Sequence, residues 1–235
     1  MSYKAIFFDM DGTLLPMDTD KFTKYYFSLL CKKVYPLGVN PDDMVKSLWA
    51  GVEAMVRNDG SRTNREVFWD IFKNYVSVDR NVIEPVCEEF YSVEFRQVKE
   101  VLGDNPLAKK AVDLAHEKAN LVVLATNPLF PFPAQDTRMD FVGLNRNDFD
   151  FITAYENSMF AKPNPAYFKW LLDKYELKGE EVLMVGNDEK EDMWAASTVG
   201  IDTYLVTDTV IRNEKYPYTG KSGTFVELIE FLNNL

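Results

Sequence analysis

The chain has 235 residues, of which 46% are apolar and 14% aromatic, so it can fold as one large domain or as a core with an insertion. Its formal net charge of −11 argues against a general nucleic-acid binder, because nonspecific binding to a phosphate backbone depends on Lys and Arg. A small phosphorylated substrate stays open, since such a ligand needs only local positive charge.

The chain carries no pattern typical of a membrane span or a signal peptide. Its apolar runs are short, and the residues before the first predicted strand lack a leader pattern, which predicts a cytoplasmic protein. Cys31 and Cys87 lie in helix-like patterns and are expected to be small buried side chains, not a disulfide or a metal site. The oligomeric state stays open.

Taken in chain order, the first predicted elements are one strand and then a long helical stretch. Residues 3–8 read as a buried strand, whereas residues 17–99 contain no convincing strand. Four helices are expected there: about 18–35, 41 to about 56, a helix after Thr63, and a helix from Asp79 to about 99. Asn40 and Pro41 supply an N-cap and a first-turn proline, and Thr63 with Glu66 forms a capping box. The aromatic residues of this stretch are interpreted as its core.

After residue 103 the pattern changes to alternating helices and strands. Helices are expected over 107–118, 164–175, about 189–199 and 224–234, and strands over 120–127, 150–154, 181–188 and 201–206. This alternation implies right-handed crossovers and a parallel sheet. The predicted fold class is α/β, a Rossmann-like parallel sheet with helices on both faces. Residues 1–16 and 100–235 form its core, and residues 17–99 are an all-helical insertion.

Two carboxylates close the first strand. Asp9 and Asp11 follow the apolar residues 5–8 at once, and Gly12 comes next. Carboxylates this close repel each other and lose hydration if they are partly buried, so such a pair usually needs a cation or binds one. The alternative is an ordinary Asp-Gly turn after a strand, which this dipeptide by itself favours.

Polar residues after other strands favour the cation site. Ligands of an open parallel sheet bind at the carboxyl ends of its strands. Carboxylates, a hydroxyl, amides and one lysine are all expected at that edge, from Thr126, Asn127, Lys162, Asn187, Asp188 and Asp192. Asp9 and Asp11 are therefore interpreted as half of a cation site that Asp188 completes. The neighbouring acidic run at Glu189, Glu191 and Asp192 is interpreted in part as a solvated helix N-terminus.

The whole chain resembles a haloacid dehalogenase superfamily hydrolase of the phosphatase type, with a helical cap domain inserted after the first motif. The motifs are DxDGT at 9–13, Thr126-Asn127, Lys162-Pro163 and the acidic stretch 186–192. The resemblance implies a Mg²⁺-dependent phosphatase that hydrolyses a small phosphorylated metabolite through an aspartyl-phosphate. A phosphomutase of the same superfamily and an inactive phosphate-binding module are the alternatives. A dehalogenase is disfavoured because that chemistry uses no metal, and because the family's dehalogenases lack the second aspartate, which is present here as Asp11.

The resemblance also implies catalytic roles. Asp9 is the nucleophile, and Asp11 protonates the leaving oxygen and then deprotonates the attacking water. Thr126, Asn127 and Lys162 hold the phosphoryl oxygens. The Lys162–Pro163 peptide bond is expected to be cis, as in some family members.

The Mg²⁺ ligands implied by the resemblance are Asp9, Asp11, Asn187, Asp188 and Asp192. The family's commonest fourth motif has an aspartate directly after the glycine, whereas this chain has Asn187 there and Asp188 next. Asp188 is expected to make the charged contact, and Asp192 to orient Lys162 or a metal-bound water. Which of these three residues touches the metal stays open.

The polar segment 57–64, RNDGSRTN, is expected to approach the active site from the insertion. In capped members of the family, a loop between cap helices closes over the phosphate and contacts the leaving group. Arg62 is the first choice for a substrate contact, because a guanidinium binds a carboxylate or a second phosphate through two hydrogen bonds, and Asn58 is the second choice. The Pro-rich segment 127–133 is either a wall of the site or a plain loop.

Overall fold

The computed structural model describes residues 3–235, which are built around one six-stranded sheet. The strands are all parallel and lie in the order β3-β2-β1-β4-β5-β6. They span β1 Ala5–Phe8, β2 Leu121–Leu124, β3 Phe151–Ile152, β4 Val182–Gly186, β5 Asp202–Val206 and β6 Lys221–Gly223. Because β1 pairs with both β2 and β4, the segments that follow these three strands meet at one place, here called the sheet edge.

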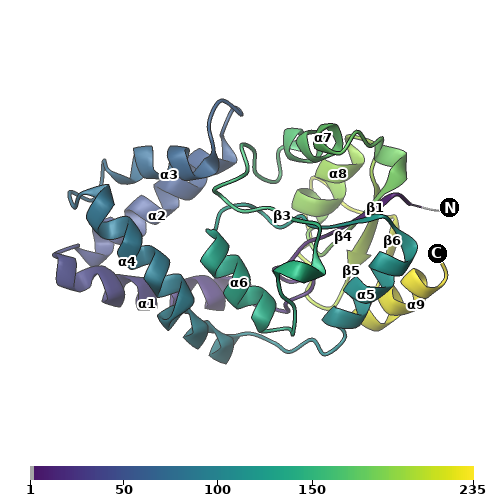
Figure 1. The fold of residues 1–235 in the computed structure, drawn as a ribbon, viewed down its shortest axis with the longest axis horizontal. Coiled ribbons are helices and arrows are strands. Elements are labelled where there is room, and N and C mark those ends of the chain that lie inside the picture. Colours follow the sequence, from purple (N-terminus) through teal and green to yellow (C-terminus); the bar gives the residue numbers. More distant parts are fainter. Residues whose placement is uncertain (1–2) are drawn as a thin grey trace.

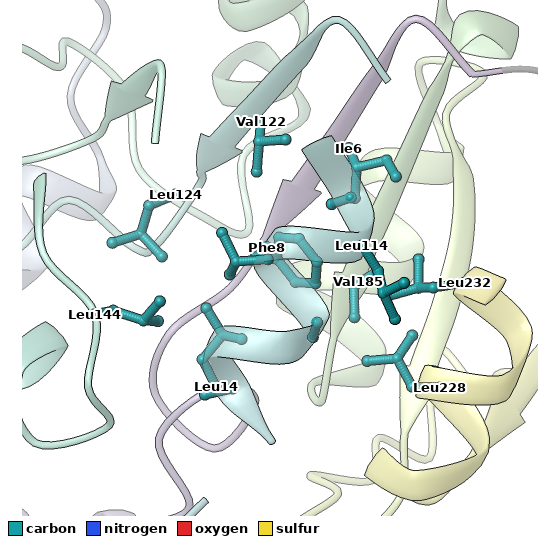
Figure 2. Close-up of a cluster of buried hydrophobic side chains, with 14 of the residues drawn as sticks. Ile6, Phe8, Leu14, Leu114, Val122, Leu124, Leu144, Val185, Leu228 and Leu232 are labelled. Atoms are coloured by element: carbon teal, nitrogen blue, oxygen red, sulfur yellow. The ribbon is translucent and has the colours of Figure 1, made fainter. Parts of the chain in front are cut away.

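Helices cover both faces of the sheet, as the apolar runs of its central strands require. Ile6 and Phe8 pack in a cluster with α5 (Ala108–Lys118) and α9 (Phe225–Asn233). On the other face, Phe7 packs with α7 (Pro165–Lys174) and α8 (Ala195–Ser197). Figure 2 shows Phe8 in this cluster, with Leu114 of α5 and Leu228 of α9 to its right. The predicted fold class is confirmed.

Residues 19–101, here called the helical region, form a second body to one side of the sheet (Figure 1). Its elements are α1 Thr19–Val34, η1 Tyr35–Leu37, α2 Pro41–Val56, α3 Asn64–Phe72, α4 Arg80–Ser92 and η2 Glu94–Val101. Aromatic side chains such as Phe22, Phe72 and Phe90 dominate its own buried cluster. The predicted cap at Asn40 and the capping box of Thr63 and Glu66 are both present. The region is inserted between β1 and α5, while the domain boundaries at residues 17 and 99 stay a prediction.

Four elements differ from the sequence analysis. The helix expected over about 189–199 is a π-helix over Glu189–Trp194 followed by the short α8. The fourth helix ends at Ser92 and is followed by the 3₁₀ helix η2, in which Phe95 and Val98 are both fully buried, since residues three apart face the same way in this helix type. The Pro-rich segment leads into a helix that was not predicted, α6 (Phe132–Asp140), because a proline in the first turn removes no helical hydrogen bond. The polar edge strand β6 also lacked a sequence signal.

No helix within residues 3–235 is long and apolar enough to cross a membrane. In the same residues both cysteines are unpaired; Cys87 is buried, and Cys31 is only partly so. The expectation of small buried side chains therefore fits Cys87 better than Cys31.

Candidate active site

A cavity of about 450 Å³ lies between the sheet edge and the helical region. Its polar end is lined by residues that follow three strands: Asp9 and Asp11 after β1, Thr126 and Asn127 after β2, and Asn187, Asp188, Glu191 and Asp192 after β4. Side chains from α1 to α4 line most of the remainder, together with Met17, Tyr155, Ile211 and residues 129–131. The pairing of β1 with β2 and β4 in the sheet therefore brings the first, second and fourth motifs to one cavity.

Lys162, the third motif, joins the first motif to the fourth. Its side chain is fully buried, and its Nζ donates hydrogen bonds to Asp9 Oδ1 at 2.8 Å and to Asp192 Oδ1 at 2.6 Å. Burial disfavours the ammonium form, but the two carboxylates outweigh burial and raise the pKa of Lys162. The lysine therefore stays charged and holds the carboxylate of Asp9 in place.

The turn after Asp9 depends on Gly12 and Thr13. Gly12 has a φ of +87°, and a Cβ at this position would lie 2.2 Å from Asn187 Nδ2, so only glycine fits. The hydroxyl of Thr13 lies 3.2 Å from both Asp9 Oδ2 and Asn187 Oδ1, which ties the first motif to the fourth. The Asp-Gly pair is thus a turn and part of the site at once.

The fourth motif is organised around Asp192, which is almost fully buried. Its Oδ2 accepts hydrogen bonds from the backbone N–H groups of Asn187 and Asp188, both at 3.0 Å. Burial raises the pKa of Asp192 to about 7, although Lys162 opposes the rise. Asp188 Oδ1 caps the following π-helix η5 (Glu189–Trp194) by accepting from two of its backbone N–H groups. Asp192 thus contacts the lysine and the loop backbone.

Asp11 has a partner that the sequence analysis did not find, Arg138 of α6. The Arg138 side chain is fully buried, forms an ion pair with Asp11 Oδ2, and stacks 4.4 Å from the centre of the Phe130 ring. Burial raises the pKa of Asp11, and the guanidinium offsets part of that rise. The other carboxylate oxygen, Oδ1, is buried and has no hydrogen-bond partner within the described chain. Arg138 gave no sequence signal because it lies on the unpredicted helix.

Glu191 is a second residue that the sequence analysis missed. Its Oε2 accepts a hydrogen bond from Asn127 Nδ2 at 2.9 Å. Burial, followed by the negative charge of Asp188, raises the pKa of Glu191 to about 7. The interpretation of this acidic run as a solvated helix N-terminus is wrong for Glu189 and Asp192, since both are buried. Glu189 accepts instead from Arg212 and from the backbone N–H of Asn213.

Thr126 and Asn127 differ in how their side chains are used. The Asn127 amide binds the Lys162 backbone, accepting from its N–H at 3.2 Å and donating to its carbonyl at 3.3 Å. Thr126 lines the cavity, and its hydroxyl is buried and has no hydrogen-bond partner among the described residues. The Lys162–Pro163 bond is cis, as expected. A ligand at the polar end can therefore bind a free hydroxyl.

The residues expected to bind Mg²⁺ supply the right kind of donor. All are carboxylate or amide oxygens, which Mg²⁺ prefers, and Asp11 Oδ1 is a buried acceptor without a partner. Within residues 3–235, however, no group of three or more Asp, Glu, His or Cys side chains is arranged to hold a metal ion. Lys162 and Arg138 instead neutralise Asp9 and Asp11. Asn187 Oδ1 faces Thr13, and its amide donates to the Thr209 carbonyl.

The polar segment 57–64 contacts the sheet-bearing part of the chain, but Arg62 and Asn58 do not line the cavity. The Arg62 guanidinium pairs with Asp70, and the buried Asn58 amide donates to the Arg62 carbonyl and to Asn64 Oδ1. Asn64 Nδ2 lies 3.2 Å from the carbonyl oxygens of Pro128 and Phe160. The loop thus packs beside the second and third motifs, and the substrate contacts of Arg62 and Asn58 stay a prediction.

Comparison with known proteins places this site in a family. A sequence model of the haloacid dehalogenase-like hydrolases matches residues 3–200. A phosphoglycolate phosphatase of Vibrio parahaemolyticus is 24% identical over 215 residues, covering 87% of this chain and 83% of that protein. A glyceraldehyde 3-phosphate phosphatase of Methanothermobacter thermautotrophicus is 26% identical over 244 residues, covering 99% and 97%.

Solved structures agree on the fold. A phosphatase of this superfamily from Thermococcus onnurineus is 18% identical with a TM-score of 0.60, covering 97% of each chain. CbbY from Rhodobacter sphaeroides, solved in complex with phosphate, is 17% identical with a TM-score of 0.62, covering 96% of each chain. At these identities the two structures show a shared fold.

Proposed function

Since the chain belongs to the haloacid dehalogenase-like hydrolase family, we propose that it is a Mg²⁺-dependent phosphatase that hydrolyses a small phosphorylated metabolite through an aspartyl-phosphate intermediate. The observation that carries this proposal is the environment of Asp9. Its carboxylate lines the cavity at the end of β1 and is held by a buried, charged lysine. Asp11 and the free Thr126 hydroxyl line the same cavity.

The proposed reaction has two steps at one phosphorus atom. In the first, a carboxylate oxygen of Asp9 attacks phosphorus, the bond to the leaving oxygen breaks, and Asp11 gives that oxygen a proton. In the second, Asp11 takes a proton from a water molecule, which attacks phosphorus and releases Asp9 and inorganic phosphate.

Arg138 suits Asp11 to both steps. The guanidinium occupies one carboxylate oxygen and leaves Oδ1 free for proton exchange. Burial raises the pKa of Asp11, which favours the protonated form needed to protonate the leaving oxygen. The ion pair opposes that rise and keeps the ionised form accessible for the second step.

Charge at the phosphoryl group is balanced by groups that line the cavity or contact Asp9. The Thr126 hydroxyl and the Lys162 ammonium support binding of the non-bridging oxygens, which gain charge in the transition state. The carboxylates of Asp9 and Asp188 and the backbone carbonyl of Asp11 would hold Mg²⁺, with Asn187 and Asp192 organising the loop. When bound, the ion supplies positive charge between the nucleophile and the phosphate dianion.

The test is hydrolysis of p-nitrophenyl phosphate and of a panel of phosphorylated metabolites, with Mg²⁺ and with chelator. The panel includes phosphoglycolate and glyceraldehyde 3-phosphate, the substrates named in two relatives. We expect inorganic phosphate to be released only with the metal. Full activity in chelator would overturn the metal requirement, and an isomeric phosphate in place of free phosphate would favour a phosphomutase.

A further inference from the structure

The cavity is chemically divided between its two ends. Away from the carboxylates its walls are aromatic and aliphatic side chains that come from α1, α2 and α3, among them Phe22, Tyr26, Trp49, Phe68 and Trp69. The total volume of about 450 Å³ falls within the range of pockets that enclose small organic ligands. The space beyond the phosphate position is therefore apolar and large enough for a ring.

The apolar end has no cationic side chain to pair with a second negative charge. Among the lining residues of the described chain, none is Lys, Arg or His. Glu84 and Glu88 do line the cavity, and Arg65, which pairs with Glu84 at 2.7 Å, is not part of the lining. A carboxylate or second phosphate on a substrate would lose hydration here without gaining a cation, which is costly.

Apart from the carboxylates of Glu84 and Glu88, the polar groups on the apolar walls are neutral. The hydroxyls of Tyr26 and Tyr91 bind each other at 2.6 Å and so need no ligand. The indole N–H of Trp69 is buried and has no acceptor within residues 3–235. An unpartnered buried donor is satisfied by a neutral oxygen or a π-face as well as by an anion.

We propose, on the basis of the proposed phosphatase activity, that the substrate is a phosphomonoester whose alcohol portion carries no negative charge, is largely apolar and is of aromatic size. The phosphoryl group binds at the sheet edge, and the alcohol portion fills the space between α1, α2 and α3. Specificity then comes from the helical region through apolar burial, and not from an ion pair with Arg62.

The closing experiment compares two esters with similar alkyl leaving oxygens that differ only at the far end. One is 3-phenylpropyl phosphate and the other is 3-carboxypropyl phosphate, so the chemical step is matched and only remote binding differs. We expect kcat/KM to be about 10²-fold higher for the phenyl ester, the scale on which apolar pockets discriminate. Equal values, or a preference for the carboxylate, would overturn the inference.

Variants locate the preference in the cavity. Phe68→Ala removes a partly buried aromatic wall and should reduce kcat/KM for the phenyl ester by about 10-fold. It should reduce kcat/KM for the carboxylate ester by a smaller factor, so that the preference for the phenyl ester narrows. Phe231→Ala is the matched control. This partly buried ring lies in α9, packs on Tyr204 and does not line the cavity. An equal effect of the two variants would place the preference elsewhere.

Val52→Lys supplies a second, independent variant, because it adds a cation to the lining without emptying the aromatic cluster. It should narrow or reverse the preference for the phenyl ester; an unchanged preference would contradict the inference.

Binding separates this inference from the proposed function. Calorimetric titration of both esters into the wild-type protein should show at least about 10-fold tighter binding of the phenyl ester. Preferential binding without release of phosphate would overturn the phosphatase and leave the inference standing. Phosphate release with equal binding of the two esters would support the phosphatase and overturn the inference.

Discussion

The sheet edge and the helical region build the two ends of one cavity in different ways. At the sheet edge, polar side chains hold one another: Lys162 binds Asp9 and Asp192, and Arg138 binds Asp11. In the helical region, most of the cavity walls are side chains of the aromatic cluster, which pack by shape. A substitution at the sheet edge therefore disturbs a network of ion pairs, whereas a substitution in the helical region changes the shape of an apolar cavity wall.

The largest expected effect is the loss of turnover when the nucleophile at the sheet edge is replaced. Asp9→Asn keeps the shape of the side chain but removes the nucleophile, so turnover of every phosphate ester should be lost. Lys162 keeps Asp192 as a partner, so the fold should survive. Phosphate release and the circular dichroism spectrum measure the two effects. Near-normal turnover would show that Asp9 is not the nucleophile.

The next effect tests Arg138, which acts through Asp11. Arg138→Met leaves Asp11 without its ion-pair partner and should reduce kcat for all esters by about 10²-fold, at the lower end of what acid–base catalysis contributes. KM should change little, because Arg138 does not line the cavity. Arg138→Lys retains the charge and should recover part of kcat. A purely structural role would lower stability and leave the pH profile of kcat unmoved.

A smaller effect concerns Glu191 and the pH dependence of stability in metal-free protein. Its pKa is about 7 in the folded state, above the ordinary value, so the folded protein binds more protons than the unfolded chain between about pH 4.5 and 7. Its contribution therefore favours folding below that window and is lost as pH rises through it. Glu191→Gln should flatten the decline and stabilise the protein above pH 7 by roughly 1–3 kcal/mol. Urea unfolding at pH 5 and pH 8 measures the difference, and parallel pH profiles for wild type and variant would contradict it.

The smallest expected effect comes from two capping boxes of the same type, one in the helical region and one in the helix α9 that packs on the sheet. Thr63 begins α3 in the helical region, and Thr224 begins α9 against the sheet. Each Thr→Ala substitution should cost about 1 kcal/mol of stability. Only Thr63→Ala should raise KM for the phenyl ester, because α3 carries Phe68 and Trp69. Equal changes in KM from both variants would mean that the helical region does not shape substrate binding.

Much of the architecture followed from local patterns. Apolar runs that stop at Asp9, Thr126 and Asn187 predicted strands with polar ends, and parallel pairing placed those ends together. Caps at Asn40 and Asn164 marked helix starts correctly. The helix α6 was missed because Pro131 and Pro133 resemble a loop, although prolines are tolerated in a first helical turn. The Pro-rich segment was therefore a wall in part, since Phe130 and Pro131 line the cavity.

The sequence by itself determined five of the six strands, the family and the motif residues, because strand ends and helix caps depend on neighbours a few positions apart. Only the tertiary structure decided which charges neutralise each other. Arg138 and Asp11 are 127 positions apart, and their pairing depends on how α6 packs, which no local pattern records. The same holds for the cavity, since aromatic residues at helical spacing predict a core but do not reveal which of them also face a ligand.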